Sequence, residues 1–168
     1  MIDHSIKAAH DRMIEKKWDK IYVLVDIHNT IFKPSYYKKE TYEWFDSAKE
    51  SLQYMTKCKE ICLILWTSSY DDKIKEYIDV FEKNGIHFDY INENPEVTND
   101  DLSCFDKKLY FNIGIDDKFG FSAESGDWEV FYMRLNQFFK IEEEPKDEMT
   151  NCYKLSPSIE KTIGELVV

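Results

Sequence analysis

The sequence has no long hydrophobic run. Its longest uninterrupted apolar stretch, residues 61–66, is far short of the roughly 20 residues that a helix needs to cross a bilayer. The first residues also lack the basic, apolar and small-residue regions that make up a secretory signal. We therefore expect a cytoplasmic protein that does not enter a membrane.

Paired cysteines are missing as well. The four cysteines include no CxxC pair, and no nearby histidine completes a zinc-binding set; they are Cys58, Cys62, Cys104 and Cys152. This pattern disfavours the common zinc modules and favours reduced thiols in a reducing compartment.

Positive charge is scarce. Lysine and arginine number 22 against 33 aspartates and glutamates, which gives a net charge of −11. The resulting field repels a phosphate backbone, so general nucleic-acid binding is not expected. A local site for one phosphate remains open, because a bound metal ion reverses the sign of the charge around it.

The sequence does contain enough apolar residues for a core. Hydrophobic residues make up 43% of the chain and aromatic residues 15%, and 168 residues fit one domain. We predict a single domain over residues 1–168, with its core at about 21–140. An N-terminal helix at 5–19 precedes this core, and an acidic C-terminal tail at 142–168 follows it.

Strands and helices are expected to alternate along the chain. The apolar patterns predict strands at 21–27, 61–66, 87–91 and 109–115, and helices at 5–19, 41–57, 71–84 and 127–139. Loops are expected at 32–37 and 92–106, and a last short helix at 158–166. Asp71 or Ser69 is the expected N-cap of the third helix, and Gly85 its stop. This alternation predicts an α/β fold, a three-layer Rossmann-like sandwich whose mainly parallel sheet has helices on both faces.

Reactive polar residues follow three of these strands. Asp26, His28 and Thr30 follow the first, Thr67 and Ser68 the second, and Asp116 and Asp117 the last. In parallel α/β sheets ligands bind beyond the carboxyl ends of the strands, so we expect these groups to share one edge.

The inventory at this edge fits phosphoryl transfer. A carboxylate serves as nucleophile or metal ligand, and a carboxylate pair supplies oxygen ligands for a hard cation such as Mg²⁺. A hydroxyl holds a phosphoryl oxygen, and a lysine balances the transferred charge. Lys107, Lys108 and Lys118 are the lysines near the last strand.

The order of these motifs resembles that of the haloacid dehalogenase-like (HAD) superfamily of phosphohydrolases. The first motif is matched by VLVDIHNT at residues 23–30, and the second by LILWTS at 63–68. Lys108 or Lys107 matches the third motif, and FNIGIDD at 111–117 the fourth. The resemblance covers about residues 21–140.

The resemblance implies a role for each matched residue. Asp26 would attack the substrate phosphorus, and Mg²⁺ would be held by Asp26, the backbone carbonyl of His28, and Asp116, with Asp117 binding directly or through water. Catalysis would also use Thr67 and Lys108, and the substrate would be bound by Thr30, Thr67, Ser68 and Lys108.

One position departs from the family pattern. His28 stands where most phosphatases of this family carry a second aspartate as general acid/base. Histidine can fill that role, because its ordinary pKa lies near neutrality. The alternative is a catalytically weak or inactive member that binds metal or a phosphorylated ligand in a regulatory role.

The chain leaves no room for a large cap domain. Residues 31–66 are used by one loop, one helix and one strand, so the site is expected to be open. By family analogy such sites suit phosphorylated macromolecules, or need a partner that shuts out water, although a small substrate also fits. A receiver domain is disfavoured, because its acid pair follows the first strand. A third alternative is that the acidic tail from Glu142 serves protein–protein contact.

Overall fold

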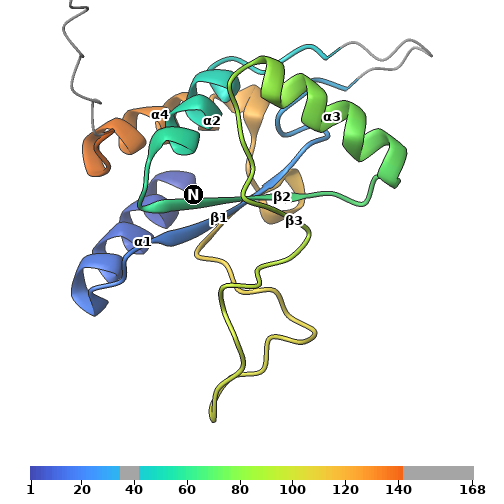
Figure 1. The fold of residues 1–168 in the computed structure, drawn as a ribbon. Helices are drawn as coiled ribbons and strands as arrows, with labels where there is room; N and C mark the ends of the chain where they lie inside the picture. The colour runs from blue at the N-terminus through green and yellow to red at the C-terminus, as the bar shows by residue number, and fades with distance from the viewer. Residues whose placement is uncertain (35–41, 142–168) are drawn as a thin grey trace, which may run out of the picture.

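The centre of the molecule is a four-stranded parallel sheet (Figure 1). The computed structural model describes residues 1–34 and 42–141, so the acidic tail and the predicted helix at 158–166 lie outside it. The strands are β1 (Ile21–Asp26), β2 (Ile61–Trp66), β3 (Tyr90–Ile91) and β4 (Ile113–Ile115), in the spatial order β3-β2-β1-β4. β3 and β4 are therefore the two edges, and the chain that joins them must cross the whole sheet.

Helices pack against this sheet and give the Rossmann-like α/β fold that the sequence predicted. They are α1 (Ile2–Lys16), α2 (Ala48–Lys57), α3 (Asp71–Lys83) and α4 (Asp127–Phe138), with short 3₁₀ turns η1 (Asp117–Phe119) and η2 (Ala123–Ser125). In Figure 1, α2 and α3 lie on one side of the sheet and the segment 92–112 projects from the other. None of the helices in the described part of the chain is long and apolar enough to span a membrane.

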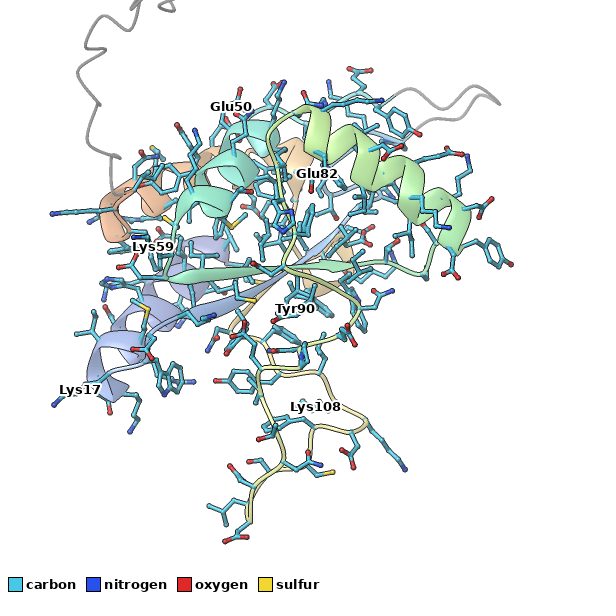
Figure 2. All side chains as sticks on the ribbon, in the orientation of Figure 1. Lys17, Glu50, Lys59, Glu82, Tyr90 and Lys108 are labelled. Atoms are coloured by element: carbon cyan, nitrogen blue, oxygen red, sulfur yellow. The ribbon has the colours of Figure 1, made fainter. Side chains whose placement is uncertain are left out.

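The side chains of β1 and β2 alternate between two apolar clusters. Figure 2 shows that side chains fill the space on both sides of the sheet. The odd-numbered ones, such as Val23 and Leu63, join a large cluster to which all four helices contribute. The even-numbered ones, such as Leu24 and Ile64, form a small cluster with side chains of β3 and of residues 109–111. Strands buried on both faces read as continuous apolar runs, which is why the sequence predicted them well.

Apolar stripes place α1 and α4 against this large cluster. α1 buries Ile2, Ile6, Ala9 and Met13 at helical spacing, and α4 buries Trp128, Phe131 and Leu135. Asp3 of α1 and Arg134 of α4 also form an ion pair.

Both edge strands are shorter than predicted, for a common reason. Asp89 stands before β3 and Asn112 before β4, and each accepts a backbone N–H of the neighbouring strand with its side-chain oxygen, at 2.7 Å from Leu63 N and 2.8 Å from Tyr22 N. A side chain thus replaces a backbone carbonyl in the ladder, and regular pairing begins one residue later.

The ends of the helices also differ from the prediction. α2 starts at Ala48 rather than near residue 41, because Trp44 pairs with Phe32 through an isolated antiparallel bridge and Ser47 has a left-handed φ of 60°. α1 lies at 2–16 instead of 5–19, ending where Lys17 turns left-handed. Tyr70, not Asp71 or Ser69, is the N-cap of α3. Gly85, with φ 68°, follows α3 as predicted.

Candidate functional site

Three aspartates meet at the carboxyl edge of the sheet. Asp26 ends β1, and the register Val25–Ile115 places Asp116 beside it, directly after β4. One carboxylate oxygen from each of Asp26, Asp116 and Asp117 lies within 4.8 Å of the others. Parallel pairing of strands far apart in sequence thus builds the acidic cluster that the motifs predicted.

Burial and mutual repulsion set the charges of this cluster. Burial raises the pKa of Asp26 to about 6, with a further increase from the Asp116 charge, against the opposing hydrogen bond from Ile27 N–H. Burial also raises the pKa of Asp116. The pKa of Asp117 is lowered, chiefly by its hydrogen bond from Lys118. Three carboxylate oxygens, two of them on groups whose negative charge the environment penalises, match the needs of a hard divalent cation.

Thr30 connects Asp26, which ends β1, with Asp117, which follows β4. Its hydroxyl lies 3.5 Å from Asp26 Oδ2 as donor and accepts the N–H of Asp117 at 3.3 Å. Its carbonyl accepts the indole N–H of Trp128 at 2.7 Å. We expected Thr30 to bind substrate; the residue is fully buried, and its hydroxyl contacts Asp26 and Asp117 instead.

A tight turn after β1 brings a further residue to the site. Asn29 has a left-handed φ of 57°, which asparagine tolerates better than most residues, and its N–H bonds the carbonyl of Phe32 at 3.1 Å. Its side chain hydrogen-bonds Asp117 and lowers the pKa of that carboxyl. The sequence reasoning missed Asn29; its position inside the first motif, between His28 and Thr30, was the available signal.

His28 lies at the rim of the cluster. The residue is exposed, and its charge acts to lower the pKa of Asp26. Its ring Nε2 is 2.9 Å from the hydroxyl of Tyr77 on α3. The tyrosine therefore orients the imidazole beside the acids.

Thr67 and Ser68 occupy the end of β2 as predicted. Thr67 is buried, and its hydroxyl bonds the Ser69 hydroxyl at 3.0 Å while accepting the Ser69 N–H at 3.2 Å. The side chain of Asn92 accepts the backbone N–H of Thr67 and donates to the Thr67 carbonyl, each at 2.8 Å. Ser68 is exposed.

The lysine beside the acids is not the one expected. Lys107 and Lys108 are both exposed, and neither is among the groups that chiefly shift the pKa values of the three aspartates. Lys118 instead places Nζ 2.8 Å from Asp117 Oδ1, and the charges of Asp116 and Asp26 help to raise its pKa. The sequence showed Lys118 directly after the acid pair, but the family pattern favoured a lysine before the strand.

Comparison with known proteins supports the fold alone. No family model and no curated protein matches this chain. A solved structure of a conserved protein from Bacteroides thetaiotaomicron is similar, with a TM-score of 0.54 and 24% sequence identity. The match covers 70% of this chain and 91% of that one, so the two chains share the parallel α/β architecture.

Proposed function

We propose that this protein is a cytoplasmic, Mg²⁺-dependent phosphomonoester hydrolase of the HAD type. The observation that carries the proposal is the convergence of Asp26, Asp116 and Asp117 on one point, with oxygens within 4.8 Å. The motif order in the sequence supports the same conclusion, as does the site's position at the carboxyl edge of a parallel sheet.

The residues that would hold Mg²⁺ are the three aspartates, together with the backbone carbonyl of His28. When bound, the ion offsets the negative charge of the phosphoryl group and of the acids around it. The raised pKa of Asp26, about 6 without metal, shows that the folded protein alone leaves this charge poorly compensated.

The chain's own groups then account for two displacement steps. The Asp26 carboxylate attacks phosphorus and the P–O ester bond breaks, while His28 in its protonated form gives its proton to the leaving oxygen. Neutral His28 next takes a proton from a water molecule, which attacks the phosphorus of the aspartyl-phosphate. Inorganic phosphate leaves, and the Asp26 carboxylate and protonated His28 are regenerated.

Positioning groups support both steps. Tyr77 orients the His28 ring at 2.9 Å, and Thr30 holds Asp26 and the Asp117 backbone in place. Lys118, tied to Asp117, adds the positive charge that balances the transferred phosphoryl group.

The test is Mg²⁺-dependent phosphate release from a panel of phosphomonoesters, with Asp26→Asn alongside the natural chain. Loss of the nucleophile should lower turnover by about 10³-fold or more. Asp72→Asn, at an exposed position on α3, removes an equal charge away from the site and should leave turnover unchanged. Turnover that survives Asp26→Asn would rule out the aspartyl-phosphate mechanism.

A second candidate is a regulatory protein that binds Mg²⁺ or a phosphorylated ligand without turning it over. The observation that favours it is His28, which replaces the family's second aspartate and is already engaged with Tyr77. Saturable binding of Mg²⁺ and of a phosphate analogue, abolished by Asp26→Asn and accompanied by no phosphate release, would establish this alternative.

A further inference from the structure

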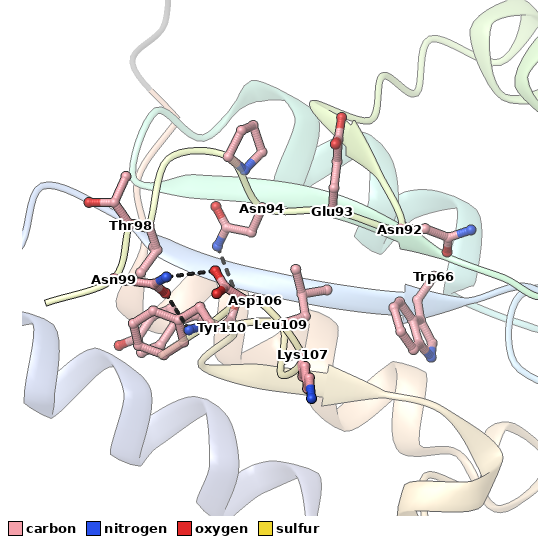
Figure 3. A pocket seen from close by; sticks show the side chains of 13 residues that line it. Trp66, Asn92, Glu93, Asn94, Thr98, Asn99, Asp106, Lys107, Leu109 and Tyr110 are labelled. Atoms are coloured by element: carbon pink, nitrogen blue, oxygen red, sulfur yellow. Dashed lines mark hydrogen bonds between the residues drawn. The ribbon is translucent and has the colours of Figure 1, made fainter. Parts of the chain in front are cut away.

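A pocket of about 570 Å³ adjoins the end of β2, as Figure 3 shows. Its walls are Trp66, the chain that follows β3, and the returning chain before β4. Trp66 is the register partner of Asp26, so their backbones lie about 4.8 Å apart on neighbouring strands and their side chains leave the same face of the sheet. One wall of the pocket, Trp66, therefore stands next to the residue proposed as nucleophile, on the neighbouring strand.

Hydrogen bonds within the chain fix the walls of this pocket. Asn92 makes two side-chain hydrogen bonds to the Thr67 backbone, and Asn94 donates to the carbonyl of Tyr110 at 2.9 Å. Asn99 donates to Asp106 at 2.6 Å and accepts the Phe105 N–H at 2.5 Å. These polar side chains already have partners, so the hollow is preformed rather than left between loose loops (Figure 3).

Three other wall side chains have no such partner. In the part of the chain that the structure describes, Trp66, Glu93 and Lys107 make no side-chain hydrogen bond, ion pair or ring contact. Trp66 is 37% exposed, whereas the five preceding residues of β2 are all buried. The end of β2 thus presents an unused indole to the pocket, and the chain after β3 and before β4 adds one carboxylate, of Glu93, and one ammonium group, of Lys107, to its walls.

We propose that this pocket binds the base of a nucleoside monophosphate whose phosphate lies at the aspartates. The inference rests on the proposed function, because it names the substrate class of that same site. The base stacks on the Trp66 indole, an amino group of the base donates to Glu93, and Lys107 donates to a ring or sugar acceptor.

The charge of the chain favours a single nucleotide over a polynucleotide. With a net charge of −11 and two acidic residues, Glu93 and Asp106, on the pocket walls, the protein repels a long phosphate backbone. A base with an exocyclic amine, by contrast, donates a hydrogen bond to Glu93. Adenosine 5′-monophosphate fits this description, and inosine 5′-monophosphate lacks the amine.

The first experiment compares kcat/KM for adenosine 5′-monophosphate and ribose 5-phosphate, which differ by the base. The natural chain should prefer the nucleotide by about 10-fold or more, the effect of one base–aromatic stack. Trp66→Leu should abolish this preference, and Trp66→Phe should restore most of it. Trp18→Leu is the matched control, because Trp18 has the same 37% exposure and lies outside the pocket.

A second experiment needs no turnover. Equilibrium dialysis of adenosine against the full chain should show saturable binding that Trp66→Leu weakens about 10-fold and Trp18→Leu does not change. Glu93→Gln should reduce the preference for adenosine over inosine. Because adenosine carries no phosphate, this readout is independent of the aspartates.

The outcomes separate this inference from the proposed function. Turnover with equal kcat/KM for the two phosphates overturns the base pocket and leaves the hydrolase standing. Adenosine binding that depends on Trp66, without any phosphate release, supports the pocket and removes the hydrolase. Absence of adenosine binding, or binding unchanged in Trp66→Leu, overturns the inference.

Discussion

The two faces of the sheet are built in different ways. The odd-numbered side chains of β1 and β2 pack into one large cluster with all four helices. On the even-numbered face, three buried residues, Leu24, Cys62 and Ile64, meet four partly buried side chains from β1, β3 and the segment 92–112. The first face is held by apolar burial.

Hydrogen bonds and an ion pair of Glu96 hold the segment 92–112 instead. Glu96 accepts from the hydroxyls of Tyr22 and Tyr90 at 3.2 and 3.1 Å, and its carboxylate lies 2.9 Å from Lys20 Nζ. The two faces therefore have different roles. The face with the large apolar cluster stabilises the fold, whereas the other face holds the wall of the pocket in place with little apolar burial.

The largest effect on stability should come from truncating an apolar side chain on the face that the helices cover. Leu65→Ala removes a fully buried side chain from the large cluster and should lower the free energy of unfolding by about 3 kcal/mol, as buried Leu→Ala changes do. Leu109→Ala, in the partly buried layer of the other face, should lower it by about 1 kcal/mol or less. Urea denaturation of both variants measures the contrast, and equal losses would contradict it.

The charge of Asp26, at the edge of the sheet, should oppose folding, in contrast to the charge of Glu96, which holds the segment 92–112. The pKa of Asp26 rises on folding from 3.8 to about 6, so the folded state binds more protons between these values and loses stability as pH increases through them. After allowance for solvent screening, Asp26→Asn should therefore stabilise the metal-free protein at pH 7 by about 1–2 kcal/mol. Asp72→Asn should have no such effect.

Thermal unfolding at pH 4 and pH 7 measures this prediction. The gain from Asp26→Asn should be present at pH 7 and nearly vanish at pH 4, where the natural aspartate is largely protonated in the folded protein. Mg²⁺ should stabilise the natural chain at pH 7 more than the variant, and this difference should shrink below about pH 6. A destabilising Asp26→Asn change at pH 7 would contradict the charge balance described here.

The smallest effect should come from weakening the polar contacts of Glu96. Glu96→Gln removes the ion pair with Lys20 and weakens two tyrosine hydrogen bonds, which are worth less than about 1 kcal/mol because they lie near the surface. Amide hydrogen exchange in residues 94–106 should accelerate a few-fold, while exchange in α2 stays unchanged. Because these contacts lower the pKa of Glu96, they should be lost only as the pH falls below 4.5, the usual pKa of a glutamate.

Local pattern was enough to predict the two central strands, and the order of the strands then predicted the meeting of the acids. β2 has the predicted bounds, because an apolar run buried on both faces has no competing interpretation. The convergence of Asp26 with Asp116 follows from parallel topology alone. These parts of the fold depend on properties that neighbouring residues share.

Other features depend on partners that lie far away in the sequence. Residues 42–47 carry a helical pattern, yet the bridge between Trp44 and Phe32 prevents the helix. The burial of Thr30 under Trp128, and the choice of Lys118 over Lys108 at the acids, also follow from tertiary contacts. No local signal distinguishes these outcomes.

The connection between the two edge strands has an evolutionary consequence. Crossing three strand spacings requires only about 15 Å of chain, which five extended residues can span, yet residues 92–112 provide 21. The surplus is tolerated because the entropy of closing a loop grows only slowly with its length. Insertions, deletions and substitutions can therefore accumulate in the middle part of this segment, residues 97–106, away from the side chains that bond the strands, so ligand preference can diversify while the acids stay in place.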